Sequence, residues 1–163
     1  MKYKILLVED ISSWQKILDG KIRSAVENVS DVDCDIKIVD NFDEAYTALQ
    51  EGTWDLLVTD ISFKLSEQEE EKLGKELVEI AHTQSIPTIV ASGRLTPQGV
   101  ADLFEEYTIL GFFEKQSFDR KKFISRIQEV LQSKEQQAKE TVPPMPNTIT
   151  QTDNENIVNV LAP

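Results

Sequence analysis

The sequence has little cysteine, little histidine and no long apolar run. Cys34 is its one cysteine and His82 its one histidine, and a single cysteine excludes a disulfide within the chain. No stretch approaches the ~18 consecutive apolar residues that a membrane-spanning helix needs. The N-terminal segment also lacks the apolar run and small-residue cleavage site of a secretory leader. We therefore expect a cytoplasmic protein without a membrane span.

Basic residues are few as well. Lys and Arg number 17 against 29 Asp and Glu, which gives a formal net charge of −12. A chain this acidic repels DNA, RNA and anionic membranes, so we expect neither nucleic acid nor membrane as a partner. Four basic residues near the C-terminal end form a local exception: Arg120, Lys121, Lys122 and Arg126. They form either a solvated helix face or a surface that binds a partner.

Apolar residues alternate between strand-like and helix-like spacing up to about residue 133. The spacing predicts strands at 3–8, 34–39, 55–59, 87–91 and 111–114. It predicts helices from 14 to 29, from 43 to 51, from 66 to 84, from Thr96 onward and from about 117. Side chains expected to face the interior include Ile38 in the second strand and Phe104 in the fourth helix. Five strands that alternate with five helices predict an α/β domain, doubly wound, with a mostly parallel sheet covered on both faces.

The composition changes near the C-terminal end. Residues 141–163 hold four of the six prolines, several Asn and Thr, and no periodic apolar face. Such a segment buries too little apolar surface to offset the entropy of ordering it. We expect one domain over residues 1–136 and a disordered tail or linker over 137–163.

Polar residues with complementary chemistry follow four of the predicted strands. Glu9 and Asp10 follow the first strand, Asp60 the third, Ser92 the fourth and Lys115 the fifth. Ligands of open α/β sheets bind beyond the carboxyl ends of the strands. The sequence therefore brings three carboxylates, a hydroxyl and an ammonium group to one edge of the sheet.

This set of groups suits phosphoryl chemistry. Three neighbouring carboxylates repel one another unless a cation joins them, and oxygen ligands without His or Cys suit Mg²⁺, with Mn²⁺ as an alternative. Asp60 can attack phosphorus as a carboxylate nucleophile. Lys115 and the Ser92 hydroxyl can hold the phosphoryl oxygens.

The order of these residues along residues 3–133 resembles the receiver domains of bacterial two-component response regulators. The resemblance implies a flavodoxin-like five-stranded sheet of order 2-1-3-4-5 and Asp60 as the phosphoacceptor. It implies Glu9, Asp10, Asp60 and the backbone carbonyl of Ser62 around Mg²⁺, and Ser92, Lys115 and Phe112 as phosphoryl-binding and switch residues. It also implies a histidine kinase or phosphotransfer protein as donor. A protein target, unknown from the sequence, would bind the face of the fourth helix, fifth strand and fifth helix. The only reactions of such a protein are its own phosphorylation and dephosphorylation.

Two stretches depart from the family pattern. Lys64 stands where the family has proline, and the glycine expected to open the next helix, Gly74, comes late, which indicates an insertion at residues 63–72. Gln116 replaces the proline that usually follows the active-site lysine. Because a cis bond before a non-proline residue costs about 3–4 kcal/mol, we expect the Lys115–Gln116 bond to be trans.

Several alternatives remain open at this point. These departures also fit a receiver-like interaction module that works without phosphorylation. A phosphoaspartate hydrolase of the haloacid dehalogenase type needs an Asp two residues after the nucleophile, where this chain has Ser62. A flavodoxin-like electron carrier needs a phosphate-binding loop after the first strand, where Glu9 and Asp10 would repel phosphate. Phe112 is either a switch or a core residue, His82 is expected at the surface, and Trp14 is expected in the core.

Overall fold

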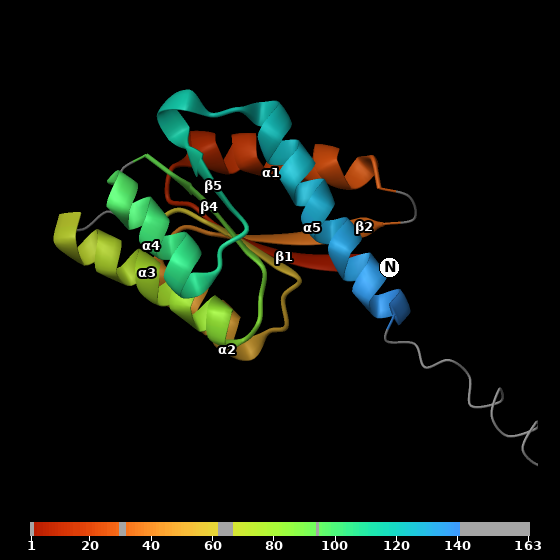
Figure 1. The fold of residues 1–163 in the computed structure, drawn as a ribbon, viewed down its shortest axis with the longest axis horizontal. Coiled ribbons are helices and arrows are strands. Elements are labelled where there is room, and N and C mark those ends of the chain that lie inside the picture. The colour runs from red at the N-terminus through yellow and green to blue at the C-terminus, as the bar shows by residue number, and fades with distance from the viewer. Residues whose placement is uncertain (1, 30–31, 62–66, 94, 141–163) are drawn as a thin grey trace, which may run out of the picture. The chain divides into compact units, whose positions relative to one another are not determined.

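The computed structural model describes residues 2–29, 32–61, 67–93 and 95–140, and it contains the predicted alternation of strands and helices (Figure 1). The strands are β1 (Lys2–Val8), β2 (Asp33–Val39), β3 (Leu56–Thr59), β4 (Thr88–Ser92) and β5 (Gly111–Glu114). The helices are α1 (Ser12–Glu27), α2 (Phe42–Glu51), α3 (Glu67–Thr83), α4 (Pro97–Tyr107) and α5 (Arg120–Glu140). A short 3-10 turn, Lys115–Ser117, follows β5 directly.

The five strands form one parallel sheet of order β2-β1-β3-β4-β5, which confirms the expected fold class. The last residue of β1, Val8, lies in register with Val39 of β2 and Thr59 of β3. In the same way Ser92 of β4 pairs with Glu114 of β5. The residues that follow these strands therefore emerge at the same edge of the sheet.

Helices cover both faces of the sheet (Figure 1). On one face α1 and α5 pack on the strands around a core that includes Leu18, Ile22, Phe123 and Ile127. On the other face the apolar sides of α2 and α3 bury Leu49 and Leu77 against the sheet, and a third cluster joins α3 and α4. Strands buried on both faces read as continuous apolar runs, which explains the unbroken run in β1.

Local signals in the sequence fix where several helices begin and end. The Asn41 side chain accepts a hydrogen bond from the Glu44 backbone N–H at the start of α2, and Gly52 follows its last residue. Thr96 caps α4 in the same way through the Gly99 N–H, with Pro97 as the first helical residue. Both arrangements satisfy backbone groups that a helix end leaves without an intrahelical partner.

The structure corrects two expectations about which side chains face the interior. Ile38 is 41% exposed and Phe104 is 42% exposed, whereas both were expected to face the interior. Ile38 lies on β2, an edge strand with a neighbour on one side only, so its side chains are covered less than those of central strands. In α4 the buried stripe is narrow, consisting of Gly99 and Leu103 one helical turn apart, and Phe104 lies just outside it.

The chain divides into two compact units, residues 1–131 and 132–163. Of the second unit the structure describes residues 132–140, which are the last turns of α5. The helix thus continues four residues past the expected end of the domain at residue 136. The rest of the expected tail, residues 141–163, lies outside the described residues. Among the described helices none is both long and apolar enough to cross a membrane.

Candidate functional site

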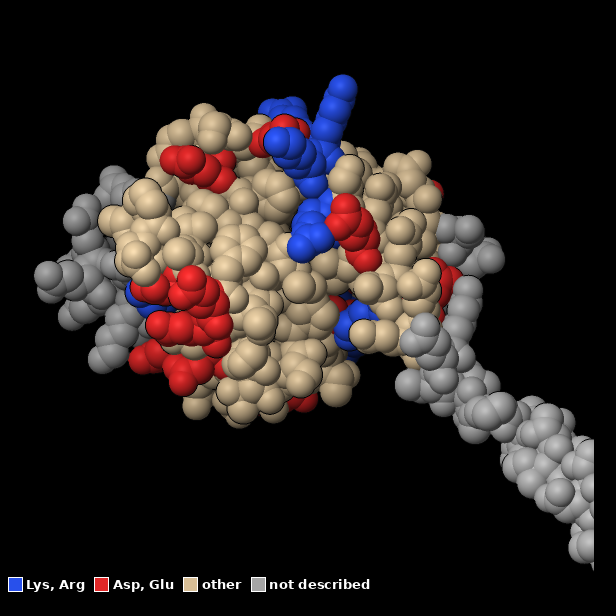
Figure 2. All heavy atoms as spheres, in the orientation of Figure 1, with Lys and Arg blue, Asp and Glu red and all other residues tan. Residues whose placement is uncertain are grey.

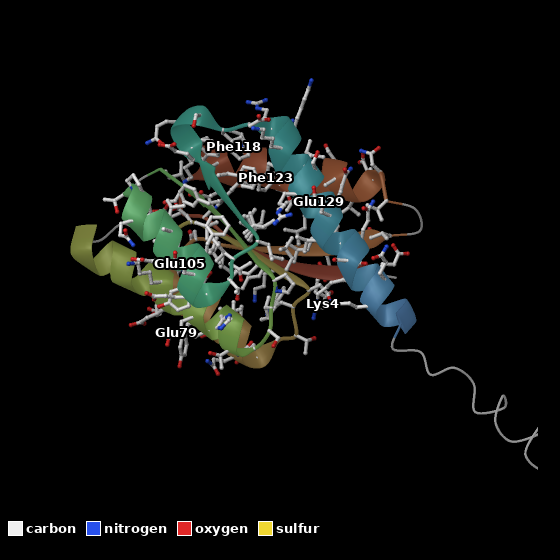
Figure 3. The ribbon with its side chains drawn as sticks, viewed as in Figure 1. Lys4, Glu79, Glu105, Phe118, Phe123 and Glu129 are labelled. Atoms are coloured by element: carbon white, nitrogen blue, oxygen red, sulfur yellow. The ribbon has the colours of Figure 1, made fainter. Side chains whose placement is uncertain are left out.

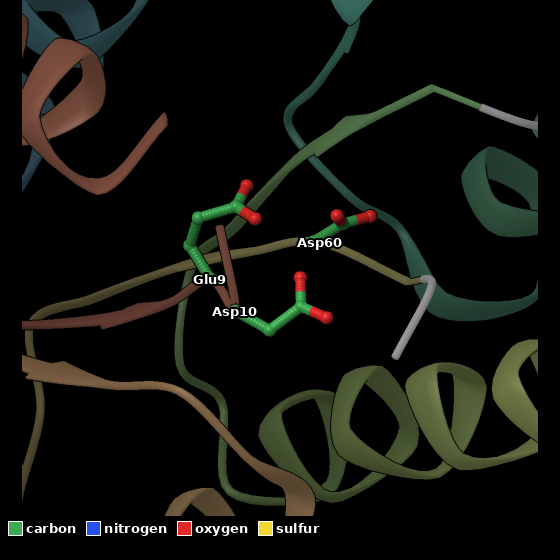
Figure 4. Close-up of side chains that lie close together, drawn as sticks. All are labelled: Glu9, Asp10 and Asp60. Atoms are coloured by element: carbon green, nitrogen blue, oxygen red, sulfur yellow. The ribbon is translucent and has the colours of Figure 1, made fainter. Parts of the chain in front are cut away.

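Three carboxylates meet where β1 and β3 end (Figure 4). Oxygen atoms of Glu9, Asp10 and Asp60 all lie within 4.8 Å of one another. Glu9 and Asp60 are buried, at 0% and 3% exposed, and Asp10 is half-buried. The backbone N–H of Asp60 donates to the Val8 carbonyl, and that of Glu9 donates to the Val39 carbonyl. The sheet's hydrogen bonding thus holds the backbone of both buried acids.

Lys115, the first residue after β5, lies between the two buried carboxylates. Its Nζ atom is 2.6 Å from Oε1 of Glu9 and 2.7 Å from Oδ2 of Asp60. Burial alone would lower the pKa of Lys115. Attraction to Asp60 and the hydrogen bonds to both carboxylates outweigh that effect and raise the pKa of Lys115 above its ordinary value. The ammonium group therefore stays charged and offsets part of the negative charge.

Glu9 behaves differently from an ordinary surface acid. Burial raises the pKa of Glu9 to about 7, with a further contribution from repulsion by Asp60, against the opposing effect of the bonds from Lys115. Its second oxygen accepts a hydrogen bond from the Ile11 backbone N–H at 3.1 Å. One lysine therefore does not fully compensate the charge of this cluster at neutral pH.

The carboxylate cluster fits a divalent cation of the hard type. All three side chains offer oxygen atoms, and the raised pKa of Glu9 marks a site where added positive charge is favourable. The fourth expected contributor, the Ser62 carbonyl, lies outside the described residues, as do positions 63–66 of the expected insertion. Residues 67–72 of that insertion form the first turns of α3.

Ser92 ends β4 and is buried, at 0% exposed. Its Oγ atom has no hydrogen-bond partner among the residues that the structure describes. A buried hydroxyl without a partner is costly, and this one lies beside the end of β5, where its O–H is able to donate to a bound group.

The two neighbouring phenylalanines of β5 face opposite sides of the sheet, as the strand period requires. Phe112 packs in the cluster of α3 and α4, and Phe113 packs against the core beneath α1 and α5. Both are half-buried. Phe112 therefore lies in the layer that α4 covers, where Leu103 of that helix is buried.

Sequence reasoning missed two residues that the structure brings to the site. Trp14 of α1 was expected only in the core; it does pack there, and its ring also lies under the Lys115 ammonium group, 5.3 Å from Nζ to the ring centroid. Gln116 was considered only as a replacement for proline, yet its side-chain N–H donates to the Gly93 carbonyl. The one available signal for Trp14 was its place four residues after Asp10, at the start of the expected helix.

Gly74 has a different role from the expected one, because it lies inside α3 and does not open it. A Cβ atom at this position would lie 2.2 Å from the carbonyl oxygen of Ile61, the residue after Asp60. Only glycine permits so close an approach of two backbones. The helix therefore packs directly on the backbone that carries Asp60.

Comparison with known proteins gives a fold and no close relative. No family model matches the sequence, and no curated protein matches it. Solved receiver domains match the structure. A signal receiver domain from Vibrio parahaemolyticus has 14% identity and a TM-score of 0.68, and covers 88% of this chain and 100% of its own.

Two further receiver domains align over most of the chain. That of a Francisella response regulator has 16% identity and a TM-score of 0.61, with 81% of this chain and 98% of its own covered. One from Clostridium thermocellum, of a two-component histidine kinase, has 19% identity and a TM-score of 0.61, covering 79% and 97%. The chain has the flavodoxin-like fold of response-regulator receiver domains.

Proposed function

We propose that this chain is a receiver that accepts a phosphoryl group on Asp60 and signals by protein contact. The observation that carries the proposal is the position of Lys115, whose Nζ lies 2.7 Å from an oxygen of Asp60 and 2.6 Å from an oxygen of Glu9. A nucleophilic carboxylate, a paired cation and an unpartnered hydroxyl at one edge of the sheet are the groups that phosphoryl transfer to an aspartate requires.

The chemistry of the step follows from these groups. An oxygen of Asp60 attacks phosphorus, the bond between phosphorus and the donor's leaving group breaks, and an acyl phosphate forms. Lys115 is already beside Asp60 and can follow the developing charge onto a phosphoryl oxygen without a large movement. The Ser92 hydroxyl can donate a hydrogen bond to another phosphoryl oxygen. Hydrolysis of the acyl phosphate returns the carboxylate.

Glu9, Asp10 and Asp60 would hold one Mg²⁺ or Mn²⁺ ion, with the Ser62 carbonyl as a further ligand implied by the resemblance. The bound ion would neutralise charge on the incoming phosphoryl group. Asp10 is the half-buried member of the three and does not pair with Lys115 among the described contacts, so it is the carboxylate most available to a cation. Glu9 would act mainly through water.

The proposal also covers partners and location. The donor would be a histidine kinase or a phosphotransfer protein, and the site would act in the cytoplasm. The target would bind the face made by α4, β5 and α5. Figure 2 shows acidic side chains over α3 and α4 and basic ones over the start of α5. The acidic side chains near Tyr107, the last residue of α4, include Glu79, Asp102 and Glu106. Their negative charge raises the pKa of Tyr107, after the larger effect of burial.

Mass spectrometry after incubation with acetyl phosphate and Mg²⁺ tests the proposal. We expect one added phosphoryl group on wild-type protein and none on Asp60→Asn. Asp43→Asn, an exposed acid at the start of α2, is the matched control and should be labelled like wild type. Absence of label on wild type would instead favour the alternative, an interaction module that works without phosphorylation.

A further inference from the structure

Two loops at the site are joined by one side chain. The Nε2 atom of Gln116 donates a hydrogen bond to the carbonyl oxygen of Gly93 at 2.5 Å. Gln116 directly follows Lys115, and Gly93 directly follows Ser92. The bond therefore connects the two residues that come just after the proposed phosphoryl-binding groups.

The sheet itself does not make this connection. The pairing of β4 with β5 ends at Ser92 and Glu114, and the chain then turns into the 3-10 segment that begins with Lys115. No cis peptide bond occurs among the described residues, so Gln116 enters this turn through a trans bond. The Gln116 side chain extends the link between the two strands by one residue beyond the last ladder pair.

The two loops are also in close contact. A Cβ atom at Gly93 would lie 3.4 Å from Nε2 of Gln116 and 4.0 Å from Cβ and Cδ of Lys115. The backbone at Gly93 thus lies along the lysine side chain. Gly93 thus lies between two groups of the site: it directly follows Ser92, whose hydroxyl has no partner among the described residues, and it contacts the Lys115 side chain.

We propose that Gln116 is a positioning residue, whose hydrogen bond to Gly93 sets the separation of the Ser92 hydroxyl and the Lys115 ammonium group so that both bind one phosphoryl group. This inference rests on the proposed function. Gln116 touches no reacting atom. It acts by holding the loop after β4 against the loop after β5, and the two groups are placed before the phosphoryl group arrives.

Two measurements on the full chain test the role. The first uses Gln116→Met, which keeps the length of the side chain and removes its donor. In NMR spectra of the metal-free protein the carbonyl carbon resonance of Gly93 should shift, and Gln116→Lys, which retains an N–H donor, should reduce that shift. Gln50→Met on α2 is the control and should leave this resonance in place. An unchanged Gly93 resonance in Gln116→Met would overturn the inference.

The second measurement is calorimetric titration with beryllofluoride, a phosphoryl mimic, in the presence of Mg²⁺. Loss of one neutral hydrogen bond should weaken beryllofluoride binding by about fivefold in Gln116→Met. Affinity for Mg²⁺ alone should stay within about twofold, because Glu9, Asp10 and Asp60 are untouched; a purely structural defect would weaken both.

The outcomes distinguish failure of the role of Gln116 from failure of the proposed phosphoacceptor function. A shifted Gly93 resonance with unchanged beryllofluoride affinity would overturn the positioning role, although wild type still binds the mimic. If wild type binds no beryllofluoride, the proposed function fails and the role of Gln116 fails with it, while the NMR shift would still report the hydrogen bond.

Discussion

The middle of the sheet and its carboxyl edge bury different kinds of side chain. Ile5, Leu7, Val58 and Ile89 lie within the strands and are fully buried among apolar neighbours. Two residues after Leu7 and Val58, Glu9 and Asp60 are also buried, at 0% and 3% exposed, and carry ionisable groups. Burial stabilises the first set and penalises the charge of the second. The stability of the strand interiors therefore allows the edge to hold groups that do not favour folding.

The largest effect should come from the apolar region. Phe123 of α5 is fully buried, with its ring centroid 5.2 Å from that of Phe113 and 5.3 Å from that of Phe118 (Figure 3). Phe123→Ala should lower the free energy of unfolding by about 3–5 kcal/mol, because it creates a cavity in a packed core. Urea denaturation measures the loss. Phe104→Ala, at an exposed site, should cost less than about 1 kcal/mol; equal losses would contradict the assignment of the core.

At the carboxyl edge, removal of a charge should raise stability, and the size of this effect should depend on pH. Glu9 has a pKa of about 7 in the folded protein, above the ordinary value of 4.5. The folded state then holds a proton that the unfolded state has lost, so stability falls as pH rises from about 4.5 through about 7. Glu9→Gln should be more stable than wild type at pH 8 by about 1–3 kcal/mol, a range reduced from the full shift because Lys115 is coupled to it.

Denaturation of both proteins in the presence of a chelator measures this difference, which should shrink toward pH 5. Asp43→Asn is again the surface control. A difference between wild type and Glu9→Gln that stays constant from pH 5 to pH 8 would contradict a raised pKa at Glu9.

The two neighbours of Glu9 should move its pKa in opposite directions. Lys115→Met removes the hydrogen bond that lowers the pKa of Glu9, so this pKa should rise above about 7. Asp60→Asn removes a repulsive charge, so the pKa of Glu9 should fall. The lysine change should have the larger effect, because Lys115 both donates a hydrogen bond to Glu9 and attracts its charge, whereas Asp60 acts by repulsion alone. NMR titration of the metal-free protein measures both; shifts of the same sign would show that the cluster is arranged differently.

Much of the fold could be predicted from the sequence because its signals are local. The apolar run at Tyr3–Val8 and the proline after Thr96 each depend on near neighbours in the chain, and the structure confirms both the strand and the helix start. Which side chains face the interior was harder to predict. Ile38 and Phe104 fit the expected periods, but how far a side chain is covered depends on strand order and on helix placement.

The site residues likewise divide into those that sequence position predicts and those that depend on how the elements pack. Glu9, Asp60 and Lys115 could be found from their places after strands, and the structure brings all three together. Trp14 and Gln116 could not be found that way, because their contacts depend on the approach of α1 and on the path of the loop after β5. The role of Gly74 became clear only from the packing of α3 on the backbone of Ile61.

The smallest effect is expected from the two tryptophans. Each has a lysine ammonium group over its ring, Trp14 at the carboxyl edge of the sheet and Trp54 at the opposite end. Lys115 Nζ lies 5.3 Å from the Trp14 ring centroid at the carboxyl edge, and Lys4 Nζ lies 5.5 Å from that of Trp54, which precedes β3 at its other end. Cation–π contacts of this kind contribute about 0.5–2 kcal/mol. A cation bound by Glu9, Asp10 and Asp60 would change the field at Lys115 and so at Trp14, but not at Trp54. Adding Mg²⁺ should therefore change the tryptophan fluorescence of wild type and of Trp54→Phe, and leave that of Trp14→Phe unchanged. A response that persists in Trp14→Phe and disappears in Trp54→Phe would place the cation at the opposite end of the sheet.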